Sequence, residues 1–358
     1  MEELFKLEQE GYVRSFKHKT LPLTAFNYTP KTQFEKAFGD YPILRQCRGI
    51  VYDDNGVIVA RPFNKFFNWE EHTASELPCM NDTVEITEKM DGSLIIVYKY
   101  NGQLMFNTRG SFNSNQALAA EQLFPQMGYS ADWIESGKTY LFEYIGPENR
   151  IVVQYSEPKL IHLGIIDNET GKDLPRDTRF ECVPVHEFNG GLFNHDMYEL
   201  FSSMELKNKE GFVIRVVADE PRQNFRMKFK TESYKKLHAM VTGLTTVRIW
   251  EYMMLGHSFE DILSICPDEF NNWLLEVKNS IQAQYDQYLS DVYKAYEEVK
   301  CLPTRKEQAM YLMENFNHIK APVFTLLDGR EFGDHVWKLV KPEKTSPFLA
   351  QSVISDED

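Results

Sequence analysis

The sequence predicts an α+β protein in which a domain of antiparallel sheets is followed by a smaller, all-helical domain. From residue 1 to about 240, short β-branched and aromatic runs alternate with Gly, Asn, Asp and Pro, a pattern typical of strands and turns. Beyond that point the apolar residues recur at helical spacing. We therefore expect a sheet domain over 1–240, a helical domain over 241–345 and a polar, mobile tail over 346–358.

Strands of the first domain are expected where apolar runs lie between turn residues. A helical stretch over 114–127 interrupts them. The clearest expected strands are 49–52, 139–145, 151–155, 160–166 and 211–217.

The helical domain is predicted from a long apolar stripe that runs from Phe270 to Val299 and breaks at Pro303. About thirty residues of helix would be roughly 45 Å long. Thr304 with Glu307 three residues later has the pattern of a capping box, which predicts a further helix.

Composition limits the classes of protein that fit. The 358 residues carry 39 Lys and Arg against 53 Asp and Glu, a net charge of −14. Such a chain repels polyanions on average, so nucleic acid would need a local basic groove. The five cysteines have no paired metal spacing, and no segment has the roughly 20 apolar residues that span a bilayer. We expect a cytoplasmic protein with no membrane contact and no obligate protein partner.

The stretch from Glu88 to Leu94 places one lysine and one carboxylate around a glycine turn. Residues 83–87 alternate like a strand, 94–100 form a more buried strand, and a hairpin turn leads to a third strand over 103–108. Lys89 therefore lies where a strand ends, held by the sheet while its amine faces a cleft. A deprotonated amine there could attack phosphorus. A surface lysine beside a turn is the alternative.

Charged residues at other strand ends could complete such a site. Arg48, Lys65 and Arg109 are cations of the kind that bind phosphate groups. Glu143 alternates with aromatic residues in an expected strand, and Glu210 stands at the start of another. Each of these residues, taken alone, also fits an ordinary surface position.

One concentrated basic strip stands out in this acidic chain. Arg226, Lys228 and Lys230 share one face of an expected strand, with apolar residues on the other face. An exposed basic ladder of this kind favours phosphate binding, and a solvated strand face is the alternative.

Taken in order, these motifs resemble those of the covalent nucleotidyltransferases, the superfamily of ATP-dependent ligases and mRNA capping enzymes. The matching segments, spread over about 140 residues, are Lys89-Met90-Asp91-Gly92, Phe142-Glu143-Tyr144, Glu210-Gly211-Phe212-Val213 and Lys228-Phe229-Lys230. The resemblance implies a nucleotidyltransferase fold of the ligase and capping-enzyme type for the first domain.

The closer resemblance, over roughly residues 20 to 240, is to phage-type ATP-dependent RNA ligases that reseal broken tRNA. It lies in Cys47-Arg48-Gly49-Ile50, Arg61 to Asn68, Pro147 to Val152 and Lys228 to His238. The helical domain is similar mainly in being helical, with a possible role in RNA specificity.

This resemblance implies that Lys89 attacks the ATP α-phosphorus to give a lysine-adenylate. AMP would pass to a 5'-phosphorylated RNA end, and a 3'-hydroxyl would then displace it to seal the strand. Lys228 and Lys230 would hold the α-phosphate, and Arg48 and Lys65 would engage phosphates of ATP or RNA.

The resemblance also implies the other contacts of the site. Glu143 would contact the ribose. Glu143, Asp91 and Glu210 would organise Mg2+, or Mn2+ in its place, through water. Further implied contacts are Phe26 and Glu210 with the nucleotide, Arg109 and Tyr234 with RNA, and Glu260 or Asp261 with metal.

The implied substrate is RNA with 5'-phosphate and 3'-hydroxyl ends, nicked tRNA among them, in the host-cell cytoplasm if the protein is phage-encoded. DNA ligase or a capping-type nucleotidyltransferase is one alternative. A nucleotide- or RNA-binding module without chemistry is the other.

Overall fold

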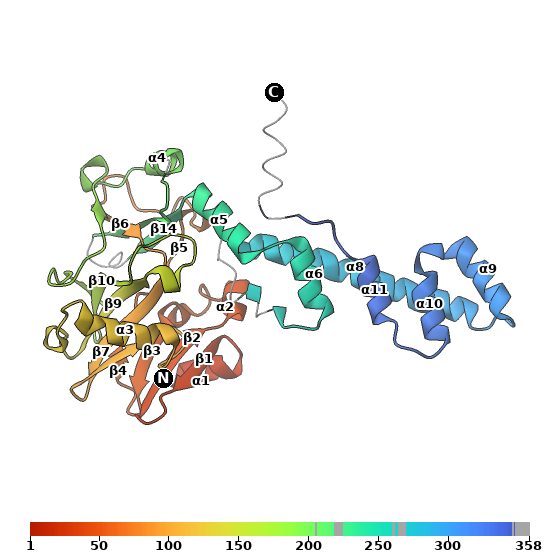
Figure 1. Cartoon of the computed structure of the whole chain (residues 1–358), viewed down its shortest axis with the longest axis horizontal. Helices are drawn as coiled ribbons and strands as arrows, with labels where there is room; N and C mark the ends of the chain where they lie inside the picture. The colour runs from red at the N-terminus through yellow and green to blue at the C-terminus, as the bar shows by residue number, and fades with distance from the viewer. Residues whose placement is uncertain (205, 218–224, 260–261, 264–269, 346, 348–358) are drawn as a thin grey trace. The chain divides into compact units, whose positions relative to one another are not determined.

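The structure is a computed structural model that describes residues 1–204, 206–217, 225–259, 262–263, 270–345 and 347. It divides into two compact units, Met1–Val241 and Thr242–Asp358. Figure 1 shows strands throughout the first unit, coloured red to green, and helices in the second, coloured cyan to blue. Apart from residue 347, the tail expected over 346–358 lies outside the described residues.

The first unit contains three sheets, which confirms the predicted α+β class. One has the order β1-β2-β3-β4, from Val13–Lys17, Leu23–Tyr28, Arg48–Asp53 and Ile58–Ala60. The second has the order β11-β10-β9-β7-β8, from Asp173–Leu174, Lys159–Asp167, Lys138–Ile145, Ser93–Tyr100 and Gln103–Asn107. The third has the order β12-β6-β13-β14-β5, from Val185–His186, Val84–Lys89, Gly211–Val216, Arg226–Lys230 and Phe67–Asn68. All strand pairs are antiparallel except β14 with β5.

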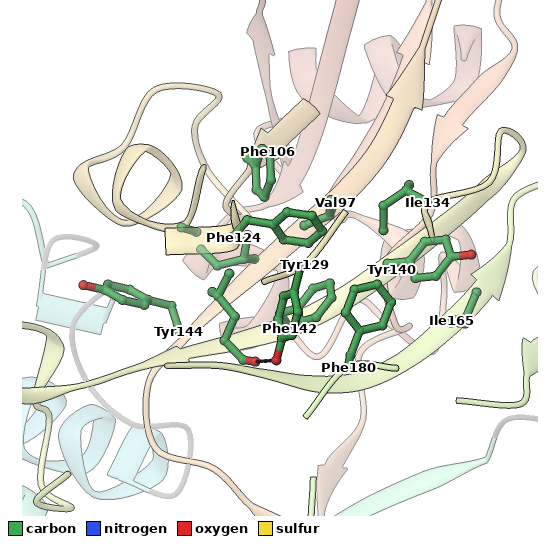
Figure 2. Close-up of a cluster of buried hydrophobic side chains, with 13 residues drawn as sticks. Val97, Phe106, Phe124, Tyr129, Ile134, Tyr140, Phe142, Tyr144, Ile165 and Phe180 are labelled. Atoms are coloured by element: carbon green, nitrogen blue, oxygen red, sulfur yellow. Dashed lines mark hydrogen bonds between the residues drawn. The ribbon is translucent and has the colours of Figure 1, made fainter. Parts of the chain in front are cut away.

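The second sheet is buried on both faces. On one face, Phe142 and Tyr144 of β9 pack into an aromatic cluster beneath α3 (Asn115–Gln126), where the Tyr129 hydroxyl donates to the carbonyl of Leu160 (Figure 2). On the other face, Leu141 packs with residues of β2 and β3. Because side chains alternate along a strand, Glu143 lies on the same face as Leu141.

Among the described residues of the first unit, the α-helices are α1 (Glu2–Gln9), α2 (Pro30–Phe34), α3, α4 (Met197–Ser203) and α5 (Glu232–Thr242). In the described part of the second unit the α-helices are α6 (Thr246–Met254), α8 (Asn271–Val299), α9 (Arg305–Asn315), α10 (Lys320–Leu327) and α11 (Gly333–Leu339). The 29-residue α8 and the capping box of Thr304 with Glu307 confirm the two helical predictions.

The strand expected over 151–155 is wrong. This segment is an irregular loop, because the backbone N–H groups of Val152 and Val153 donate to the side chain of Asp91 instead of to a neighbouring strand. The segment was apolar enough for a strand, but its hydrogen-bond partner lies 61 residues away in sequence.

Gly211→Ala should destabilise the protein strongly. Gly211 has φ +153°, and a Cβ there would lie 1.9 Å from the carbonyl oxygen of Phe229 on the adjacent strand. We expect a loss of about 3 kcal/mol or more in the free energy of unfolding, measured by urea denaturation. Gly56→Ala is the control, since Gly56 also has positive φ but nothing within 4 Å, and it should cost about 1–2 kcal/mol. Equal losses in the two variants would contradict the steric argument.

Candidate active site

Two lysines face each other across a glycine in the third sheet. In the strand register, Gly211 of β13 pairs with Lys89 at the end of β6 on one side and with Lys230 of β14 on the other. The position between the lysines carries no side chain, and the chain there accepts none without a clash. The three strands thus fix a row in which the two amines can share one partner.

That partner is the carboxylate of Glu210, which is only 3% exposed. Its Oε2 lies 2.7 Å from the Nζ of Lys89, and its Oε1 lies 3.3 Å from the Nζ of Lys230. A buried carboxylate is tolerated when it is paired and hydrogen-bonded. Glu210 therefore joins the two lysines into one charged group.

The basic strip on β14 differs from the exposed ladder that the sequence predicts. Lys228 and Lys230 are each only 8% exposed. Arg226 forms an ion pair with Asp173, and its guanidinium lies 4.1 Å from the ring centroid of Phe63. The prediction of exposure is wrong because other side chains cover this face of the strand, among them Glu210 and the ring of Tyr234 beside Lys230. Arg226 belongs to a structural ion pair, and the two lysines line the site.

Glu143 reaches the same region from the second sheet. Desolvation of its carboxyl group raises the pKa of Glu143 to about 8, against the opposing effect of Lys89. The charges of Glu210 and Asp91 raise this pKa further. A Cβ on Gly92 would lie 2.2 Å from the carbonyl oxygen of Tyr144, so only glycine lets the turn after Lys89 run against β9 at this point.

Asp91 is engaged by protein donors on both carboxylate oxygens. Its Oδ2 accepts from the backbone nitrogens of Val152 (2.8 Å) and Val153 (2.7 Å), and its Oδ1 accepts from the hydroxyl of Tyr234 (2.7 Å). Its own backbone nitrogen donates to the hydroxyl of Tyr155 at 3.1 Å. These contacts give Asp91 a structural role, in which it ties the turn after Lys89 to the 151–155 loop and to α5, whereas the sequence suggested a place near metal.

Two expected ligand contacts have a different position in the structure. Phe26 was expected beside the nucleotide, but it is fully buried between Phe5 and Tyr52 in the core beneath the first sheet. Tyr234 was expected to contact RNA, but it is 3% exposed and its hydroxyl donates to Asp91. Both expectations are corrected, because packing against the core occupies these side chains.

The cations expected to bind phosphate converge on a residue that the sequence did not single out, Tyr28. Arg48 and Arg109 donate to its hydroxyl, and the Nζ of Lys65 lies 5.6 Å from its ring centroid. Tyr28 follows Phe26 by two residues on β2, and that spacing was the available signal. The cations around Tyr28 are close in the chain to the lysine row of the third sheet. Lys65 is three residues before Asn68, and Asn68 pairs with Lys228 on the neighbouring strand. The backbone of Lys65 therefore lies at most about 11 Å from that of Asn68.

Metal ligation is the least defined part of the site. Within the described ranges, no group of three or more His, Cys, Asp or Glu side chains is arranged to hold a metal ion. Glu260 and Asp261 lie outside the described residues.

The chain was compared with known proteins. A sequence model of the RNA ligase family matches residues 46–234, more than half of the chain. The RNA ligase of Rhodothermus phage RM378 is 25% identical over 391 residues, with 86% of each chain covered. A protein of Autographa californica nuclear polyhedrosis virus, named as a bifunctional polynucleotide kinase/RNA ligase, is 26% identical over 261 residues. That match covers 64% of this chain and only 36% of the viral protein.

Among solved structures, a Naegleria gruberi RNA ligase mutant with ATP and Mn is similar at a TM-score of 0.36 and 16% identity. The match covers 44% of this chain and 52% of that one.

Two lysines around one buried carboxylate define a site suited to phosphate-bearing substrates. The family match is more specific: the chain belongs to the RNA ligase family. In the described residues, none of the helices has the length and apolar character to cross a membrane.

Tyr234→Phe tests the position of this tyrosine. The variant leaves the charged Asp91 without one donor, so we expect the free energy of unfolding to fall by about 1.5–3 kcal/mol. Tyr98→Phe is the control, because the buried Tyr98 hydroxyl has no hydrogen-bond partner and its removal should cost little. If Tyr234 contacted RNA instead, the variant would unfold like the wild type and bind RNA more weakly.

Stability should depend on pH through Glu143. The folded state holds the proton with a pKa of about 8, while the ordinary value is 4.5. Between these values the unfolded chain releases a proton that the folded chain keeps, so folding loses stability as pH rises. Relative to Glu143→Gln, the metal-free wild type should therefore lose up to about 1.4 kcal/mol per pH unit from about pH 5 to 8.

Urea denaturation at several pH values measures this difference. Glu148→Gln is the control, because Glu148 is an exposed glutamate five residues after Glu143. The stability of this variant should depend on pH as that of the wild type does. A constant difference between Glu143→Gln and the wild type across this range would contradict the assignment.

Proposed function

We propose that this protein is an ATP-dependent RNA ligase that joins 5'-phosphate and 3'-hydroxyl RNA ends through lysine-adenylate and RNA-adenylate intermediates. One observation carries the proposal: Lys89, Glu210 and Lys230 form one charged group across three adjacent strands, in which Glu210 and Lys230 are buried and Lys89 is partly exposed. A structural ion pair needs one cation for each carboxylate. The buried Lys230, with the buried Lys228 two residues before it on β14, supplies the additional positive charge that a phosphate group requires.

In the first step, the neutral amine of Lys89 attacks the ATP α-phosphorus. A nitrogen–phosphorus bond forms, and the bond to pyrophosphate breaks. Lys89 is ion-paired with Glu210, so the attack requires the amine to leave this partner and give up a proton. The α-phosphate would take over the contact of Glu210 with Lys230. The carboxylate of Glu210, 2.7 Å from the Nζ of Lys89, would then take the proton of the amine.

AMP then passes to the RNA 5'-phosphate, and the 3'-hydroxyl of the other end displaces it. Each step is a transfer at phosphorus, so catalysis depends on positioning and on neutralising charge. Lys228 and Lys230 would hold the α-phosphate, Arg48 and Lys65 the remaining phosphates, and Arg109 the RNA.

Glu143, protonated at neutral pH, would donate to a ribose oxygen. Its pKa of about 8 supports this role, because the ionised form would be present in only a minority of molecules.

Glu210 is the carboxylate that fits a hydrated Mg2+ or Mn2+, since it lies in the lysine row. Glu143 would join it only if the charge of the ion lowers the pKa of Glu143, so that this group ionises. The ion would bind through its waters and neutralise charge on the phosphates. Asp91 is omitted from this set, because its two oxygens already accept three hydrogen bonds.

The substrate class can be tested by sealing a matched panel of nicked tRNA, linear single-stranded RNA and nicked DNA duplex, each with a 5'-phosphate. Sealing of RNA alone supports the proposal, and preference for nicked tRNA would place the enzyme in tRNA repair. Sealing of nicked DNA would favour the DNA ligase alternative. Binding without sealing or labelling would favour a binding module.

Lys89→Ala should abolish covalent labelling by α-labelled ATP with Mg2+, a loss of at least about 1,000-fold, because no other nitrogen nucleophile takes its place. The label is followed on a denaturing gel. Lys99→Ala, a half-buried lysine on β7 that the proposal leaves outside the site, is the control and should label like the wild type. Label that persists in Lys89→Ala would refute the nucleophile.

A further inference from the structure

The pairing of β6 with β13 stops at the point where the proposed chemistry begins. In their register, Lys89 and Gly211 form the last pair. The turn over 90–92 and the segment over 208–210 therefore lie beyond the end of this pair of strands. Glu210 is held on the side of β14, where its carbonyl accepts from the backbone nitrogen of Thr231 at 3.0 Å. Its position relative to the turn after Lys89 is set by side-chain contacts instead.

Two of these contacts come from consecutive residues just before β13. The carboxylate of Glu210 pairs with the amine of Lys89. The Nζ of Lys209 lies 2.6 Å from Oε2 of Glu88, the residue before the proposed nucleophile. The chain that leads into β13 is therefore tied to two neighbouring residues at the end of β6.

The residue before them, Asn208, binds the 151–155 loop through both polar groups of its side-chain amide. Its Oδ1 accepts from the backbone nitrogen of Gln154 at 2.7 Å, and its Nδ2 donates to the carbonyl of Gln154 at 2.9 Å. A residue of an antiparallel strand exchanges the same two bonds with its partner. Asn208 has φ +54°, a left-handed conformation that Asn adopts more readily than most residues.

The loop that Asn208 binds also anchors the turn after Lys89. The backbone nitrogens of residues 152 and 153 donate to Asp91, and the next one, of Gln154, donates to Asn208. Three successive N–H groups of the loop thus bind side chains from both sides of Lys89. Together with the two ion pairs, these contacts close a ring that runs through 88–91, the loop and 208–210.

A ring of this kind matters because the proposed nucleophile is a long side chain that is 22% exposed. In the proposed reaction, its amine must approach the α-phosphorus in line while Glu210 stays beside it. A displacement of about 1 Å can slow such a step on the order of 100-fold.

We propose that Asn208 is a positioning residue for the attack by Lys89. Its side-chain amide takes the place of strand pairing beyond Lys89 and Gly211, and it fixes Glu210 relative to the turn that follows the nucleophile. The inference rests on the proposed function, in which Lys89 attacks ATP. Asn208 acts through the 151–155 loop and through Glu210.

Asn208→Gly tests this, because glycine keeps the left-handed backbone and removes only the amide. The measurement is the rate at which the full chain takes label from α-labelled ATP with Mg2+, as a function of ATP concentration. The maximal rate should fall about tenfold, because the nucleophile is less well placed. The ATP concentration that gives half of this rate should stay within about twofold of the wild type, because ground-state binding is kept.

Two control variants should label like the wild type. Gln154→Ala keeps the backbone groups that Asn208 binds and changes only an exposed side chain. Asn101→Gly makes the same substitution at another exposed asparagine with positive φ, 50°, in the turn between β7 and β8.

Hydrogen exchange without ATP or metal gives a readout that needs no activity. In Asn208→Gly, peptides that cover the 151–155 loop should exchange at least about fivefold faster, while those of β9 should be unchanged. If Asn208→Gly does not fold, Asn208→Asp replaces it with the same expected results. Asp also tolerates the left-handed backbone, and it places a carboxylate oxygen against the carbonyl of Gln154.

A maximal rate within about threefold of the wild type overturns the proposal, whatever the exchange shows. Unchanged exchange in the loop, equal slowing in either control, or a rise in the half-saturating ATP concentration that matches the loss of rate also overturns it. A wild type that takes no label refutes the proposed ligase function. A wild type that takes label, with Asn208→Gly labelling equally fast, refutes the role of Asn208 alone.

Discussion

The shared carboxylate of Glu210 is the interaction on which the rest of the site depends. Two lysines placed close together on different strands would repel each other, and a buried glutamate alone would be costly. Placed between them, the carboxylate makes all three charges tolerable in one row. The row requires Gly211 as the middle residue, because any side chain there would meet the neighbouring strand. The close approach of the strands at Gly211 and the pairing of both lysines with Glu210 therefore depend on each other.

The same constraint shapes how a substrate can enter. In the proposed reaction, a phosphate group that approaches Lys230 competes with Glu210 for it, and the carboxylate that is released stays beside the amine of Lys89, where it can take the proton of that amine. Lys89 itself stays fixed at its backbone, because the next turn is anchored through Asp91 to the 151–155 loop and to α5. In the proposed reaction, binding of the nucleotide and release of the nucleophile are therefore coupled, while the backbone that carries the nucleophile remains still.

Many strands of the fold and the position of Lys89 could be predicted from the sequence, and the predictions that failed did so for physical reasons. Alternation located β6, β7 and β9, and the Lys89 motif located the strand end, because both signals are local. Burial of Lys228 and Lys230 is set by strands distant in sequence, so the charges alone suggested an exposed ladder. The hydrogen bonds of Asp91 span 61 to 143 residues and convert an apolar segment into a loop. No local pattern contains that information.

The net charge of −14 gives the cation cluster at Tyr28 its importance. Long-range attraction would bring a polyanion to a basic protein, but this chain repels one on average. Affinity for a phosphate-bearing ligand must then come from short-range contacts, where two guanidinium groups in fixed geometry gain most. A terminal phosphate carries more negative charge and more free oxygens than a phosphodiester. If the cations around Tyr28 contact phosphate as proposed, they should therefore favour the ends of nucleic acids and nucleotides over the backbone of an intact strand.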